Sequence, residues 1–95
     1  MSLSAHTRLA LDAAFAPVEI ISEEHRPSRG GSTESRLHFD GVLDGARVNV
    51  LITTGGPFLH PRVAGMAWET DGPSEKTICA RVRAIVDPAG TEPDT

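Results

Sequence analysis

The chain has 95 residues, about the length of one domain, and nine basic against thirteen acidic side chains give it a formal charge of −4. A protein that wraps nucleic acid usually presents a basic face, so this balance argues against a nucleic-acid partner. The single cysteine, Cys79, excludes an internal disulfide, and no apolar run approaches the ~20 residues of a membrane span. The N-terminus has no basic, apolar leader. We therefore expect a soluble, cytoplasmic protein that does not bind membranes.

The first predicted element is a helix over residues 4–16. Ser4 can cap it, because a serine hydroxyl accepts a hydrogen bond from the first turn. Leu11 and Phe15 lie four residues apart and so fall on one face. Pro17 disfavours helical geometry in the residue before it and ends the helix.

A short strand and a loop are predicted next. Residues 18–23 are rich in β-branched side chains, which favours a strand. Residues 25–33 are rich in glycine, serine and proline, which predicts a loop, and residues 54–61 have the same character. Around the first loop, the basic side chains Arg26, Arg29 and Arg36 cluster with the acidic Glu23, Glu24 and Glu34, which is typical of a solvated loop of mixed charge.

The clearest pattern is a β-hairpin over residues 36–53. Two alternating segments flank Asp44-Gly45, a pair that suits a two-residue type I′ turn. This turn pairs Leu43 with Ala46, and the same register pairs Phe39 with Val50 and Leu37 with Ile52. A slip of one residue would move all the apolar side chains of a strand to its outward face, so the register is well specified. The outward face then carries Arg36, His38, Asp40, Arg47 and Asn49.

The last third of the chain fits more than one template. Residues 61–70 suit either a short helix or a strand, and Gly65 weakens the helix. Residues 77–86 suit a strand with alternate residues facing in, or a helix capped by Ser74. The β-branched content favours the strand. Residues 87–95 have no apolar anchor and are predicted to be a flexible tail, which leaves residues 1–86 as a single domain.

Candidate site residues are four histidines and one thiol: His6, His25, His38, His60 and Cys79. His25 and His60 stand out because each is predicted to lie in a loop near a proline. With Cys79 they could form a site if the fold brings them together. No His or Cys pair has the spacing of a metal-binding motif, so we expect no bound cofactor in the isolated chain.

Motifs for catalysis are missing from the sequence. Neither Gly-Gly pair belongs to a phosphate-binding pattern, and no Gly-x-Ser-x-Gly is present. The neighbours of Cys79 are apolar, which indicates a semi-buried, unreactive thiol. The sequence therefore favours a protein that is not an enzyme.

The first forty residues resemble the start of the BolA family. The resemblance is carried by Ala-Ala-Phe-Ala-Pro-Val at 13–18, Glu-Ile-Ile-Ser-Glu-Glu-His-Arg at 19–26, and Gly-Ser-Thr-Glu-Ser with Phe39 at 31–39. It implies a small α+β fold and a regulator that binds DNA or shares an iron–sulfur cluster with a monothiol glutaredoxin through histidine. His25 and His60 would be the metal ligands. The family's Arg-His-Arg signature, which opens a helix, is replaced here by Leu59-His60-Pro61-Arg62.

Taken together, these patterns predict an α+β domain in which an N-terminal helix packs on a small antiparallel sheet that contains the 36–53 hairpin. The expected function is a non-catalytic interaction or regulatory domain that binds another protein. Two alternatives stay open: a BolA-like iron–sulfur or redox partner or transcriptional regulator, and a phage- or plasmid-type accessory or assembly protein. The thin core, Phe58-Leu59 and Trp68 suggest apolar surface for a second chain, so a homodimer is expected.

Overall fold

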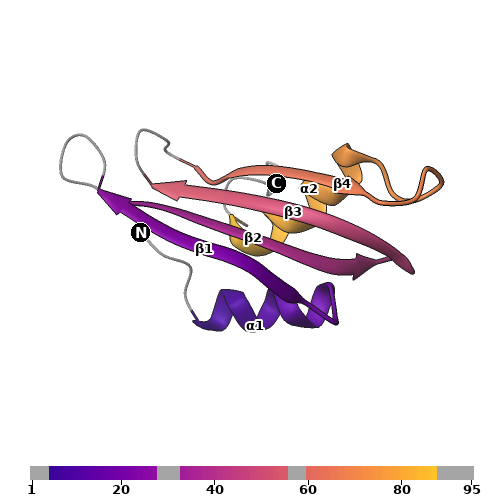
Figure 1. Cartoon of the computed structure of the whole chain (residues 1–95), viewed down its shortest axis with the longest axis horizontal. Helices are drawn as coiled ribbons and strands as arrows, with labels where there is room; N and C mark the ends of the chain where they lie inside the picture. The colour runs from indigo at the N-terminus through magenta and orange to yellow at the C-terminus, as the bar shows by residue number, and fades with distance from the viewer. Residues whose placement is uncertain (1–4, 28–32, 56–59, 88–95) are drawn as a thin grey trace, which may run out of the picture.

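The computed structural model describes residues 5–27, 33–55 and 60–87. Its four strands form one antiparallel sheet in the order β1-β2-β3-β4, with a helix at each end of the chain (Figure 1). This is the predicted α+β fold. The elements are α1 (Ala5–Ala14), β1 (Glu19–Pro27), β2 (Thr33–Leu43), β3 (Ala46–Gly55), β4 (Arg62–Ala67) and α2 (Glu75–Val86).

The central hairpin of β2 and β3 has the predicted register. Leu43 lies opposite Ala46, and Phe39 lies opposite Val50. Asp44 and Gly45 have φ angles of 53° and 81°, the left-handed values that a type I′ turn requires at both central positions. Side chains therefore alternate between two faces along both strands, as predicted.

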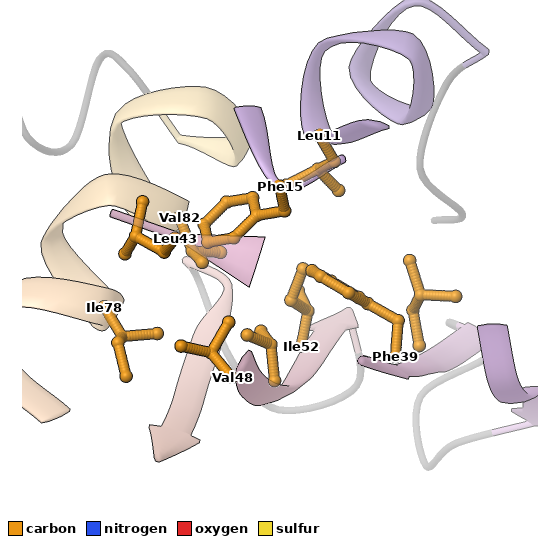
Figure 2. Close-up of a cluster of buried hydrophobic side chains, with 10 residues drawn as sticks. Leu11, Phe15, Phe39, Leu43, Val48, Ile52, Ile78 and Val82 are labelled. Carbon is orange, nitrogen blue, oxygen red and sulfur yellow. The ribbon is translucent and has the colours of Figure 1, made fainter. Parts of the chain in front are cut away.

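Both helices pack against the same face of the sheet. Figure 2 shows the core, where Leu11 of α1, Phe15 just after α1, and Ile78 and Val82 of α2 meet the inward side chains of β2 and β3. The rings of Phe15 and Phe39 meet edge to face at 5.8 Å between centroids, a favourable aromatic geometry. Among the described residues, the buried apolar core consists of Leu11, Phe15, Leu37, Phe39, Leu43, Val48, Val50, Ile52, Ile78 and Val82.

The strand predicted over residues 77–86 is wrong, because this segment is helix α2. The Ser74 hydroxyl accepts a hydrogen bond from the Thr77 N–H at 3.2 Å and so caps the first turn. Ile78 and Val82, one helical turn apart, are both buried. Cap and apolar spacing together outweigh the β-branched composition, since strand propensity is strongly context-dependent.

The ambiguous segment 61–70 contains strand β4, which completes the sheet beside β3. Gly65 explains the close packing here, since a Cβ at this position would lie 2.6 Å from Cγ2 of Ile78. The absence of a side chain at Gly65 therefore lets α2 approach the sheet.

Several predicted boundaries shift. The strand predicted over 18–23 runs to Pro27 as β1, so His25 lies in a strand and not in a loop. β3 likewise runs to Gly55, and residues 28–32 and 56–59 lie outside the described part of the chain. Asp87 ends α2 with its N–H bonded to Arg83 O, while the rest of the predicted tail also lies outside the described residues. Neither described helix is long and apolar enough to span a membrane.

Candidate functional site

The sheet face that points away from both helices is the candidate site. We call it the open face. It carries the even-numbered side chains of β2 and β4 and the odd-numbered side chains of β3. Cross-strand pairing places Ser22, Glu24 and Arg26 of β1 on it as well. None of the described helices covers this face, because the core residues of both helices meet the opposite one.

A chain of hydrogen bonds joins polar side chains in the middle of the open face. His38 Nε2 lies 2.9 Å from Asn49 Oδ1, and Asn49 Nδ2 donates to Asp40 Oδ1 at 2.8 Å. Arg47 lies 3.9 Å from the same carboxylate. These four residues are the outward hairpin set predicted from the sequence, apart from Arg36. Because they bind one another, they are held in defined positions and already satisfy much of their hydrogen-bonding capacity.

An apolar ridge runs beside this polar chain, over β3 and β4. It consists of Leu51, Ala64, Met66 and Trp68. Met66 and Trp68 are 56% and 54% exposed, and Leu51 is 36% exposed. The guanidinium carbon of Arg47 lies 5.7 Å from the centroid of the Trp68 ring, within cation–π range. Trp, Met and Arg are the residue types enriched in protein interfaces.

A hollow of about 420 Å³ lies at one end of the ridge, where it is lined by Glu34, Arg36, Leu51 and Arg62, among others. The guanidinium group of Arg36 is already bonded to Glu34 at 3.1 Å. The hollow therefore combines both signs of charge with apolar side chains.

The outer edge of β4 is less available than its face. Cys79 Sγ lies 3.5 Å from Val63 O, and Arg83 donates to Pro61 O at 3.3 Å. Side chains of α2 therefore occupy backbone acceptors along this edge, which is one way that proteins protect an edge strand.

Burial raises the pKa of the Cys79 thiol, and the nearby Glu75 raises it further, while Arg83 and a hydrogen bond from the Gly65 backbone act in the opposite direction. A raised pKa keeps the thiol protonated near neutral pH, and a protonated thiol is a poor nucleophile.

The two predicted metal ligands lie at opposite edges of the sheet. His25 is on β1, where Nδ1 lies 2.8 Å from Ser35 Oγ and Nε2 lies 3.3 Å from Glu23. His60 precedes β4 and lies 3.1 Å from Asp87. Two strands separate the edges, so with strands roughly 4.8 Å apart the fold does not bring these histidines together. Within the described ranges, no three His, Cys, Asp or Glu side chains are grouped to hold a metal.

The acidic residues around the first predicted loop each have an arginine partner. Arg8 bonds Glu23, Arg26 bonds Glu24 at 2.6 Å, and Arg36 bonds Glu34 at 3.1 Å. These pairs have the mixed charge that was predicted, but they lie on strands and on α1, and Arg29 of the predicted loop lies outside the described residues. Phe58 and Leu59, named as candidate interface residues, lie outside the described residues.

No family model, curated protein or solved structure matches this chain. The fold itself shows one difference from the expectation raised by the BolA resemblance. Strand β4 follows His60, where the family signature would open a helix.

Proposed function

We propose that this protein is a non-catalytic interaction or regulatory domain that binds another protein through the open face of its sheet. The observation that carries the proposal is the apolar ridge on a sheet face that neither described helix covers, above all the exposure of Met66 and Trp68. Each exposed large side chain costs hydration free energy in the isolated chain, and covering it by another protein recovers that cost.

Charge supports a protein partner over nucleic acid. The chain is acidic overall, and Arg26, Arg36 and Arg47 on the open face each have a carboxylate nearby. Phosphate binding relies on a basic surface, whereas protein interfaces commonly combine an apolar centre with a polar rim. A second copy of the chain is one such protein, and a larger accessory or assembly complex is another.

The test begins with the tagged full chain expressed in its native host. Captured proteins are identified, purified and measured against the chain by calorimetry. Met66→Glu places a charge in the apolar ridge and should weaken binding by about tenfold or more, as expected for an interface centre. Leu9→Glu is the matched control, because Leu9 is 70% exposed on α1 and far from the open face in the fold.

Equal binding by wild type and Met66→Glu would contradict the proposal, provided that both remain folded by circular dichroism. Loss of binding in Leu9→Glu alone would move the interface to α1.

A further inference from the structure

The open face is divided into two halves of opposite charge. Strands β3 and β4 direct Arg47 and Arg62 onto it, and Glu75 at the start of α2 borders the same half beside Met66, which gives a formal charge of +1. Strands β1 and β2 direct four carboxylates and two guanidinium groups onto it, which gives −2. The residues of this acidic half are Glu19, Glu24, Glu34 and Asp40, with Arg26 and Arg36.

The same two halves also differ in shape. Trp68 lies at the β4 side of the hairpin end, where its backbone N–H donates to Arg47 O. A hollow of about 370 Å³ lies at that end, lined by Pro17, Glu19, Asp40 and Val42, and it extends to Arg47 of β3. The aromatic side chain is thus on the β4 side of the face, and most of the lining of the hollow is on the side of β1 and β2.

Resting on the proposed function, we propose that the occupant of the open face is a second copy of this chain, packed face to face about a two-fold axis parallel to the strands between β2 and β3. This axis lays β1 of each copy over β4 of the other, so each acidic half covers a basic half. It also brings Trp68 of one copy over the hollow beside Pro17 of the other. A two-fold axis perpendicular to the strands would instead place like-charged halves together.

One ion pair follows directly from the strand register. Glu24, Arg36, Thr53 and Arg62 form a single row across the four strands. The two-fold axis exchanges the ends of that row, so Glu24 of each copy faces Arg62 of the other, beside the hollow that Arg62 lines. Two-fold symmetry makes this contact twice.

The size of the face suits such an interface. The face is roughly 33 Å long, the length of a ten-residue strand, and roughly 19 Å wide across four strands. Its projected area is about 600 Å², and a standard interface buries about 800 Å² of accessible surface per partner. The polar chain through His38, Asn49 and Asp40 is already internally bonded, which reduces the cost of covering it.

Charge reversal tests the proposal on the full chain. At high-micromolar concentration the wild type should have twice the 10.1 kDa mass of the chain by light scattering. Glu24→Arg and Arg62→Glu should each give monomers, because each sets like charges opposite one another. The double variant E24R/R62E should restore the dimer. Asp12→Arg and Lys76→Glu, exposed on the helices, are matched controls that should stay dimeric.

A cross-link tests the axis without altering these charges. In a Cys79→Ser background, copies with Ser22→Cys are mixed with copies carrying Ala64→Cys and treated with a short bismaleimide. Ser22 and Ala64 occupy the two ends of the row next to that of Glu24. The two-fold axis places Ser22 of one copy opposite Ala64 of the other. The cross-link between the two different variants should therefore be more abundant than either cross-link between identical variants.

The outcomes separate this inference from the proposed function. A monomeric wild type, or a dimer unaffected by either charge reversal, overturns the inference. A dominant Ala64–Ala64 cross-link overturns the axis and with it the inference. After any of these results, the proposed function is still tested separately. It stands if the chain binds a different protein and if Met66→Glu weakens that binding.

Discussion

Gly41 of β2 lies directly against Phe15 at the end of α1. The Val42 N–H donates to Phe15 O at 2.9 Å, and a Cβ atom at Gly41 would lie 2.8 Å from both the Cβ and the carbonyl oxygen of Phe15. The helix end therefore rests on the sheet at a point where only glycine fits. This contact anchors α1 over the core, on the face of the sheet opposite the open face.

Gly41→Ala should lower the free energy of unfolding by about 1–3 kcal/mol, the usual cost of overpacking a close contact. Urea denaturation followed by circular dichroism measures it. Ala13→Ser adds one atom to an exposed residue of α1 and should change stability by no more than about 0.5 kcal/mol. Equal stability of Gly41→Ala and wild type would show that α1 does not dock as described.

Ser74→Ala should destabilise α2 by about 1 kcal/mol, because it removes the side-chain acceptor for the Thr77 N–H. Ser74→Asp should retain most of the stability, since a carboxylate also accepts this hydrogen bond and favours a helix N-terminus. Thermal unfolding of the three proteins provides the comparison. If alanine and aspartate have the same effect, the cap does not contribute.

Cys79 should make stability fall at alkaline pH. Because burial raises the pKa of its thiol in the folded protein, the unfolded chain loses the proton first as pH rises. The thiol's contribution is therefore fully present below the pKa of the unfolded thiol and is lost as pH rises through the folded pKa. The Cys79→Ser variant has no thiol and so lacks this pH-dependent contribution to stability.

The measurement is urea unfolding of wild type and Cys79→Ser from neutral to alkaline pH. The unfolding free energy of the wild type should fall relative to that of Cys79→Ser as pH rises. A difference that does not vary with pH would mean that the thiol is not held in a desolvated site.

The purified chain should carry no stoichiometric zinc or iron, since a structural zinc site needs about four ligands and the described part of the chain groups no three candidate ligands. Elemental analysis of the purified protein checks this, and stoichiometric metal would contradict it. The BolA-like alternative requires a cluster to form only with a glutaredoxin and to be lost in His25→Ala or His60→Ala. Cluster formation that survives both substitutions would eliminate that alternative.

The hairpin could be predicted because one register places every apolar residue of two strands on the same face, as Phe39 opposite Val50 illustrates. Helix α2 was harder to predict than the hairpin, since Ile78 and Val82 are four residues apart and this spacing fits both a strand and a helix. The deciding signal was Ser74, whose capping hydrogen bond has meaning only if a helix follows.

The candidate site was predictable in part. The alternation of the hairpin identified His38, Asp40 and Asn49 as one outward group, but it could not show that they form a connected chain. The apolar ridge depends on β4 pairing with β3, which brings Met66 beside Asn49. That pairing is a long-range contact after an ambiguous segment, so local patterns could not reveal it.

Trp68 offers the most direct test of the open face, because it is the single tryptophan of the chain and belongs to the apolar ridge. Its emission is followed, with acrylamide as quencher, while the full chain is diluted through the micromolar range. If the open face joins two copies, quenching should be weak at high concentration and should increase on dilution, and in Arg62→Glu it should be strong throughout. Quenching that is equally strong at every concentration, in wild type and variant alike, would contradict the account.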